Sequence, residues 1–112
     1  MKIICRSIVI LPLFIFYGCN NEGGEVNSFG EDIDFLKQHT DVVVLSDENG
    51  SAQIAVVPAY QGRVMTSTTS GRDGNSLGWI NHAHIASGKK LEHFNPYGGE
   101  DRFWMGPEGG QF

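Results

Sequence analysis

Many of the apolar residues of this chain are concentrated in a short run near the N-terminus, so fewer remain for the rest of the sequence. The run covers residues 8–17 of a 112-residue sequence and is preceded by Lys2 and Arg6. It is too short to cross a membrane, which takes about 20 apolar residues. A basic start, a short apolar stretch and a small residue, here Gly18, are typical of an export signal. The part of the chain that can fold is therefore the remaining 94 residues.

Those 94 residues are poor in side chains that form a core. They contain 32 apolar residues, of which 20 are Leu, Ile, Val or Phe, and they contain 14 glycines. This apolar content is close to the level below which a charged chain fails to form a core, and glycine adds backbone entropy that folding must overcome. The composition therefore predicts an incomplete domain.

The charge of the same residues excludes one class of function. They carry 6 basic and 13 acidic side chains, which gives a net charge of −7. A nucleic-acid-binding domain usually presents a basic face or stripe. We therefore expect no nucleic-acid partner.

Cys19 follows Gly18 directly and is the only cysteine beyond the signal, because Cys5 lies within it. An internal disulfide in the exported product is thus excluded. A cysteine at this place resembles the signal of bacterial lipoproteins, in which that residue is acylated. We predict a lipoprotein signal at residues 1–18, a lipidated Cys19 with a flexible tether over residues 19–28, and a product anchored to a membrane of the bacterial cell envelope. An ordinary secretory signal and an uncleaved anchor are the alternatives.

The middle of the chain carries one helix signal and three strand signals. Ser28 and Glu31 have the spacing of a capping box and open a short helix that ends near residues 39–40. Two β-branched runs, residues 42–45 and 53–57, flank an Asn-Gly pair and predict a hairpin. Residues 63–69 predict a third strand, and its alternation assigns Val64, Thr66 and Thr68 to one face and Arg63, Met65 and Ser67 to the other. The pattern indicates a mainly β protein with one short helix.

Two histidines, His82 and His84, lie two positions apart and would project to the same side of a strand. Two metal ligands have this arrangement, but no cysteine or third ligand stands at a fixed spacing from them. A histidine that contacts a sugar and a structural role at the surface or in the core are the other interpretations. We predict His82 as a sugar contact, no metal site and no cofactor.

Residues 95–112 bring aromatic, acidic and basic side chains together between two Gly-Gly pairs. A strand here would place Glu100, Arg102 and Trp104 on one face and Asp101, Phe103 and Met105 on the other. An aromatic ring covers the apolar face of a sugar, and charged groups bond to neighbouring hydroxyls. The face with Glu100, Arg102 and Trp104 therefore predicts a carbohydrate site. In the alternative, Arg102 pairs with Glu100 or Glu108 and the aromatic rings belong to the core.

Glu100 and Glu108 do not have the spacing of a glycosidase pair. Eight extended residues span roughly 26 Å, whereas glycoside hydrolysis needs carboxyl groups about 5–9.5 Å apart. Only a sharp reversal at residues 106–107 would bring the two glutamates together. We therefore assign no catalytic residue.

Three blocks, residues 58–68, 78–81 and 98–112, resemble a family of poorly characterised bacterial lipoproteins related to the galactose mutarotase-like, or aldose epimerase-like, β supersandwich. The last block is the most specific, with its Gly-Gly, aromatic and Pro-Glu pattern. The resemblance covers residues 29–112 and implies the N-terminal part of a β-sandwich domain that binds a saccharide.

The resemblance also bears on catalysis. In the mutarotase-like enzymes a carboxylate base and histidine acids move the protons during ring opening. The catalytic glutamate of that family comes late in the fold, beyond Phe112. The resemblance thus implies an exported, lipid-anchored carbohydrate-binding fragment. The alternatives are an aldose epimerase-like enzyme in a full-length form and a structural or interaction lipoprotein without a small-molecule ligand.

Overall fold

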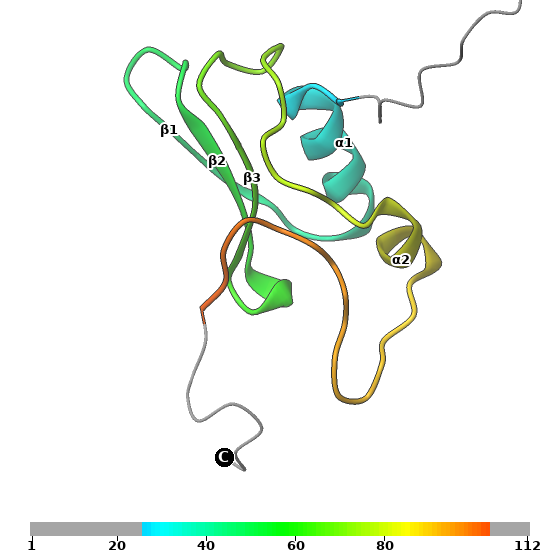
Figure 1. Ribbon diagram of the computed structural model, residues 1–112. Coiled ribbons are helices and arrows are strands. Elements are labelled where there is room, and N and C mark those ends of the chain that lie inside the picture. Colours follow the sequence, from blue (N-terminus) through cyan, green and yellow to red (C-terminus); the bar gives the residue numbers. More distant parts are fainter. Residues whose placement is uncertain (1–25, 104–112) are drawn as a thin grey trace, which may run out of the picture.

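The computed structural model describes residues 26–103, and its three strands form one antiparallel sheet in the order β1-β2-β3 (Figure 1). The elements are α1 (Phe29–His39), β1 (Val43–Ser46), β2 (Gln53–Val57), the 3-10 helix η1 (Pro58–Tyr60), β3 (Arg63–Thr68) and α2 (His82–Ser87). The sheet agrees with a small β-rich domain, but the prediction of one helix is wrong because α2 is a second one. Within residues 26–103, neither α-helix has the length and apolar content needed to cross a membrane.

Helix α1 begins as its sequence predicts. The backbone N–H of Ser28 donates to Glu31 Oε2 at 2.8 Å, and the N–H of Glu31 donates to Ser28 Oγ at 3.2 Å, which completes a capping box. These bonds satisfy backbone groups that the first helical turn leaves without partners. The helix buries Phe29, Ile33 and Leu36, each no more than 1% exposed, against the sheet.

A bulge in β3 changes the predicted alternation of that strand. Ala55 of β2 pairs with Thr66, but the next residue, Val56, pairs with Val64, so Met65 has no partner in the ladder. An extra residue on one strand reverses the side-chain alternation beyond it. Met65 and Thr66 are consecutive and both fully buried. The assignment of Met65 and Thr66 to opposite faces is therefore wrong.

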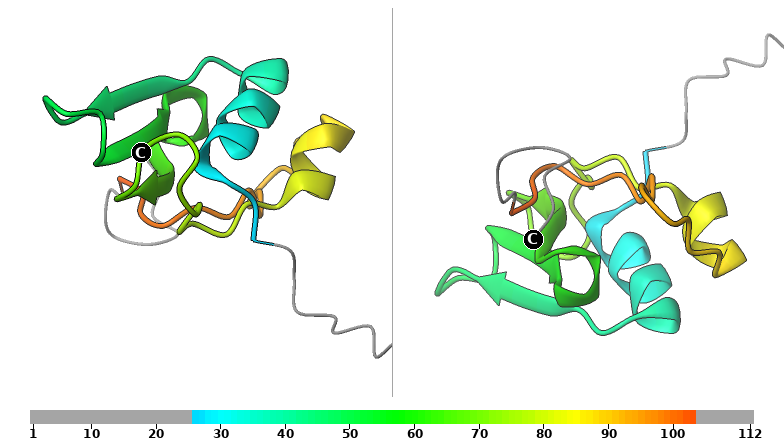
Figure 2. Two further views of the ribbon diagram at one scale, coloured as in Figure 1. Left: turned by 90° about the horizontal axis from the view of Figure 1, so that it is seen from above. Right: turned by 90° about the horizontal axis from the view of Figure 1, so that it is seen from below.

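The core lies between the sheet and the helices. Figure 2 shows both α-helices on the same side of the sheet. One cluster joins Leu36 to Val57 and Met65, together with Ile80 and Ile85 from the later part of the chain. On the other side of the sheet none of the helices formed by residues 26–103 lies, and Val43 and Leu45 of β1 remain 47% and 54% exposed.

Residues 82–87 form helix α2 and not the strand considered for the two histidines. The side chain of Asn81 caps the helix by accepting from the N–H of His84, and Gly88 ends it with a φ of +63°. Residues two apart on a helix do not share a face. His82 and His84 therefore have different partners, Asp32 and Asn95 respectively.

Between α2 and residue 103 the chain returns to the sheet without forming a regular strand (Figure 1). Single bridges join Ile80 to Gly98 and Val64 to Asp101. The predicted strand through residues 100–105 is thus wrong over residues 100–103, where only Asp101 is bridged, and the later residues lie outside the described range. The positive φ angles of Gly98 and Gly99 break the extended geometry just before this point.

Candidate functional site

The returning segment passes so close to the sheet that two glycines are required. A Cβ atom on Gly98 would lie 2.3 Å from the backbone oxygen of Trp79, and one on Gly99 would lie 2.7 Å from Cδ of Arg63. Their φ angles are +85° and +104°, which L side chains rarely adopt. The Gly-Gly pair therefore fixes residues 98–102 against β3 and the segment at Trp79.

This close approach forms a hollow of about 460 Å³, here called the Trp79 hollow. Two aromatic side chains in this hollow are exposed: Trp79 is 67% and Phe94 is 56% exposed. The charged residues that line the hollow are Arg63, Glu100, Asp101 and Arg102. A second cavity of about 280 Å³, here called the basic cavity, shares three lining residues with it: Arg63, Phe94 and Arg102.

Arg63 is a buried guanidinium, and its residue is only 5% exposed. Nη1 donates to the backbone oxygen of Gly98 at 2.7 Å and Nη2 to Oε1 of Gln61 at 3.3 Å. Within the described part of the chain, its Nε is buried and has no hydrogen-bond partner. Burial lowers the pKa of Arg63, and the nearby charge of Arg102 lowers it further, while Tyr97 acts in the opposite direction. The guanidinium is thus held firmly but not fully satisfied.

Two tyrosines form one wall of the basic cavity. The rings of Tyr60 and Tyr97 stack with their centroids 3.8 Å apart and an interplanar angle of 8°. The guanidinium carbon of Arg63 lies 5.8 Å from the centre of the Tyr97 ring, within the range of a cation–π contact. Burial, and then the neighbouring Tyr97, raise the pKa of Tyr60 above its ordinary value, so its phenol stays neutral.

The carboxylates of the Trp79 hollow are positioned by neighbouring groups. Glu100 accepts a hydrogen bond from Ser67 Oγ at 2.9 Å, and Asp101 accepts one from the backbone N–H of Arg102 at 2.7 Å. The guanidinium carbon of Arg102 lies 5.8 Å from the centre of the Phe94 ring. Acceptors, donors and aromatic rings thus face one concave surface.

The structure brings together two of the four residues that the sequence predicts as sugar contacts. Glu100 and Arg102 both line the Trp79 hollow. His82 lines a different hollow of about 420 Å³, which shares Trp79 with the first one. Trp104 and the predicted lipidation site Cys19 lie outside the described residues.

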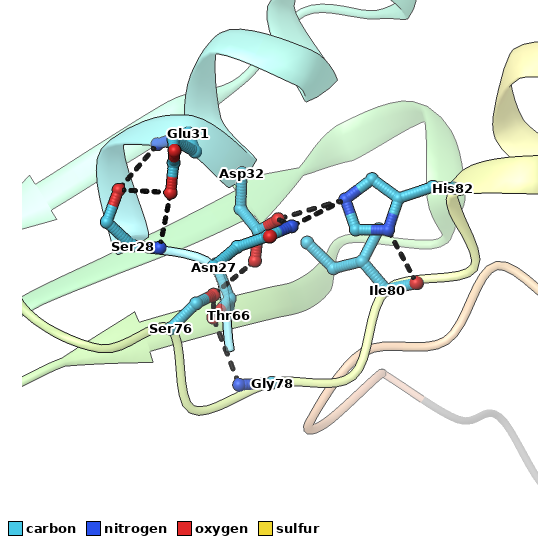
Figure 3. Close-up of polar contacts among 9 residues, drawn as sticks. All are labelled: Asn27, Ser28, Glu31, Asp32, Thr66, Ser76, Gly78, Ile80 and His82. Atoms are coloured by element: carbon cyan, nitrogen blue, oxygen red, sulfur yellow. Dashed lines mark hydrogen bonds and ion pairs between the residues drawn. The ribbon is translucent and has the colours of Figure 1, made fainter. Parts of the chain in front are cut away.

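His82 belongs to a polar network, here called the Asp32 cluster, which comprises Asn27, Asp32, Thr66, Ser76 and His82 (Figure 3). Asp32 is 2% exposed, and its carboxylate accepts from Asn27 Nδ2 at 3.0 Å, from Ser76 Oγ and from His82 Nε2 at 2.9 Å. Because the Ser76 hydroxyl donates to Asp32, the Thr66 hydroxyl donates to Ser76 at 2.6 Å and itself accepts from the N–H of Gly78.

The imidazole of His82 is fixed on three sides. Its Nδ1 lies 3.0 Å from the backbone oxygen of Ile80, its Nε2 bonds to Asp32, and its ring centroid lies 4.4 Å from that of Phe35 in α1. Both ring nitrogens therefore lie within hydrogen-bond distance of an oxygen atom of the fold. This geometry links α1 to α2.

The described residues offer no ready place for a metal ion. Among residues 26–103, no group of three or more His, Cys, Asp or Glu side chains is arranged to hold one. His82 and His84, considered as metal ligands from their spacing, bond instead to Asp32 and Asn95.

Several residues of the two cavities were not predicted as functional. Arg63 occupies a strand, and Trp79 and Phe94 are single aromatics outside any periodic pattern. The one local signal is Gly78-Trp79, a large ring beside a glycine. The contact of Arg63 with Gly98 joins residues 35 positions apart, and no periodic pattern predicts such a contact.

Comparison with known proteins gives one match. A family model described as a family of unknown function, DUF6786, matches residues 27–112. No curated protein and no solved structure matches the chain. The resemblance to mutarotase-like proteins therefore stays a prediction. The matched range contains both cavities and the Asp32 cluster, and it covers most of the sequence; the chain belongs to the DUF6786 family.

Proposed function

We propose that this protein binds a carbohydrate in the Trp79 hollow. The observation that carries the proposal is the position of two exposed rings, Trp79 and Phe94, beside two carboxylates and two guanidiniums on one concave surface. A surface of this size lies within the range of small-molecule sites, roughly 300–1,000 Å³.

Each group in the hollow suits one part of a sugar. An indole or phenyl ring packs on the apolar C–H face of a pyranose. Carboxylates accept hydrogen bonds from hydroxyl groups, and guanidiniums donate pairs of hydrogen bonds to hydroxyl or ring oxygens. Glu100 and Asp101 supply the first kind of group, and Arg63 and Arg102 supply the second.

The site is also preorganised, which favours binding over a flexible surface of the same composition. Arg63 is bonded to Gly98, and Glu100 is bonded to Ser67 of β3. A ligand would therefore meet polar groups whose side-chain entropy has already been lost on folding.

A titration with neutral monosaccharides and disaccharides, followed by calorimetry, tests the proposal. We expect saturable binding to the native chain and a loss of at least about tenfold in affinity in Trp79→Ala, since one stacked ring contributes on the order of 1–2 kcal/mol. Phe103→Ala is the matched control, because Phe103 is 70% exposed but does not line the hollow. Absence of saturable binding, or equal losses in both variants, would refute carbohydrate binding here.

We also propose that the chain is exported and lipid-anchored through Cys19. The support is the sequence alone: a basic start, a short apolar run and a cysteine directly after Gly18. Incorporation of labelled fatty acid into the native chain, and its loss in Cys19→Ala, is the expected result. Equal labelling of both proteins would refute the anchor.

The fold part of the proposal is that the sheet is one layer of a β-sandwich. Its support is the sheet face that no helix of the described part of the chain covers, where Val43 and Leu45 remain exposed. In sandwiches such a face packs against a second sheet. We expect the folded chain to bind a dye that reports exposed apolar surface, and we expect Leu45→Thr to bind less of it, because Leu45 lies on the uncovered face. Absence of dye binding would argue against a second layer.

A further inference from the structure

The basic cavity is lined by charges of one sign. Arg63, Lys90 and Arg102 line it together with His93, and none of its described lining residues is Asp or Glu. The chain as a whole has 13 acidic residues against 8 basic ones. Because the chain is acidic as a whole, a random selection of its residues would contain more acidic than basic side chains. The basic cavity, of about 280 Å³, is instead lined by three cations.

Arg63 carries this arrangement into the interior. Its residue is 95% buried, and its Nε has no partner among the described residues. A buried donor without a partner lowers stability by roughly 1–3 kcal/mol. Arg102, which lines the same cavity, adds a like charge nearby. An anion in the cavity would offset the like charges of Arg63 and Arg102, and the partial exclusion of water there would strengthen the attraction.

The acidic groups line the neighbouring Trp79 hollow and not the basic cavity. Of these two spaces, Glu100 and Asp101 line the Trp79 hollow alone, and Lys90 and His93 line the basic cavity alone. Arg63, Phe94 and Arg102 line both spaces, so the two spaces are neighbours. A ligand that spans them would meet hydrogen-bond acceptors and an exposed ring at one end and cations at the other.

From this arrangement we infer that the ligand is an acidic saccharide, whose ring occupies the Trp79 hollow and whose anionic group, a carboxylate or a sulfate, occupies the basic cavity. The inference rests on the proposed function and adds the chemical class of the sugar. The guanidiniums of Arg63 and Arg102 suit either anion, because both present oxygens to paired N–H donors. The stacked rings of Tyr60 and Tyr97 close the side of the cavity.

Matched pairs of sugars test the inference directly. Galacturonate and galactose, and glucuronate and glucose, differ only in a carboxylate that replaces a hydroxymethyl group. We expect each uronate to bind the native chain at least about tenfold more tightly than its neutral partner, and we expect added salt to reduce this preference. Galactose 6-sulfate, measured beside galacturonate, shows which anion fits better, and tighter binding of either one supports the inference.

Two lysine variants separate the cavity from general electrostatics. Lys90→Gln removes a charge that lines the basic cavity, and Lys89→Gln removes the neighbouring charge, which does not line it. Both lysines are exposed, so neither variant should affect folding. We expect Lys90→Gln to weaken uronate binding about three- to tenfold with no change for the neutral sugar, and Lys89→Gln to change neither.

The outcomes distinguish this inference from the proposed function. Equal or tighter binding of the neutral sugars overturns the inference and leaves carbohydrate binding in place. Binding of inorganic sulfate as tight as that of the acidic sugars overturns it as well, because it shows an anion site without sugar recognition. If neither acidic nor neutral sugars bind, both the inference and the proposed function fail.

Discussion

Asp32 and Arg63 are both almost fully buried charges, but their surroundings satisfy them to different degrees. The carboxylate of Asp32 accepts hydrogen bonds from three side chains. The guanidinium of Arg63 has two hydrogen-bond partners, and its Nε has none within the described residues. A charge that the fold satisfies by itself is suited to a structural role, whereas a charge left partly unsatisfied beside a cavity is suited to binding a ligand.

The two regions also differ in what they connect. Asp32 joins α1 to Ser76 and to His82 of α2, which lie 44 and 50 positions further along the chain. Arg63 joins β3 to the Gly98 loop, next to open space. Loss of the first set of bonds would separate helices from the core, and loss of the second would alter the wall of a cavity.

The largest expected effect is on stability, from Asp32→Ala. The substitution leaves Ser76, Asn27 and His82 without their shared acceptor in a buried place, and we expect the free energy of unfolding to fall by about 3 kcal/mol. Urea unfolding followed by circular dichroism measures it. Asp34→Ala is the control from the same helix, since its ion pair with Arg72 is exposed and should change stability little. Similar effects of the two substitutions would contradict a structural role for the Asp32 cluster.

The next effect tests the loop that shapes the Trp79 hollow. Gly99→Ala places a Cβ atom 2.7 Å from Cδ of Arg63 at a φ of +104°, and we expect a loss of about 2 kcal/mol or more in stability. Gly88→Ala is the matched control, because Gly88 also has a positive φ but open space around its Cα. We expect Gly88→Ala to lower the free energy of unfolding by about 1 kcal/mol. The difference between the two unfolding midpoints measures the cost of the close contact between residue 99 and Arg63. Equal losses of stability would mean that the positive φ angle alone accounts for both effects.

A smaller stability effect, with a large effect on binding, is expected for Arg63→Met. The methionine keeps an apolar stem, loses two hydrogen bonds and removes repulsion with Arg102, so we expect stability to fall by about 1–2 kcal/mol, less than in Asp32→Ala. Calorimetry should show that uronate binding is lost. Arg72→Met is the control for charge, because Arg72 lines neither cavity. A stability loss as large as that of Asp32→Ala would place Arg63 among the structural charges.

Local signals in the sequence were sufficient for α1 and the three strands but not for α2 or for the surroundings of the two buried charges. The capping box at Ser28 and the β-branched runs predicted α1 and the three strands, with β1 at Val43–Ser46 instead of residues 42–45 and β3 ending at Thr68 instead of residue 69. These features depend on neighbouring residues alone. Helix α2 had local signals as well, the cap at Asn81 and Gly88 at its end, but the alternation of two histidines favoured a strand.

The features that shape the site depend on contacts between distant residues. The bulge at Met65 arises from pairing with β2, and the environment of Arg63 arises when Gly98 returns from 35 positions away. Glu100 and Arg102 were predicted from their local pattern and do lie together, although on a bridged segment and not on a strand. Trp79 and Lys90 join them only through the tertiary fold.

The smallest expected effect compares Asp32 with its neighbour Glu31, which is exposed. Hydrogen bonds from the backbone and the side chain of Ser28 lower the pKa of Glu31 below its ordinary value. A carboxyl group with a lowered pKa in the folded state stabilises the fold above its unfolded pKa, and that contribution is lost as the pH falls through the folded value. Glu31→Gln should therefore lower the urea midpoint slightly at neutral pH, and its difference from the native chain should disappear between about pH 5 and about pH 3.

Ser28→Ala, which removes one of the donors, should show the same pH trend, with a loss of about 1 kcal/mol at neutral pH. A difference that stays constant over this range would mean that the cap acts through geometry alone and that the charge of Glu31 contributes nothing.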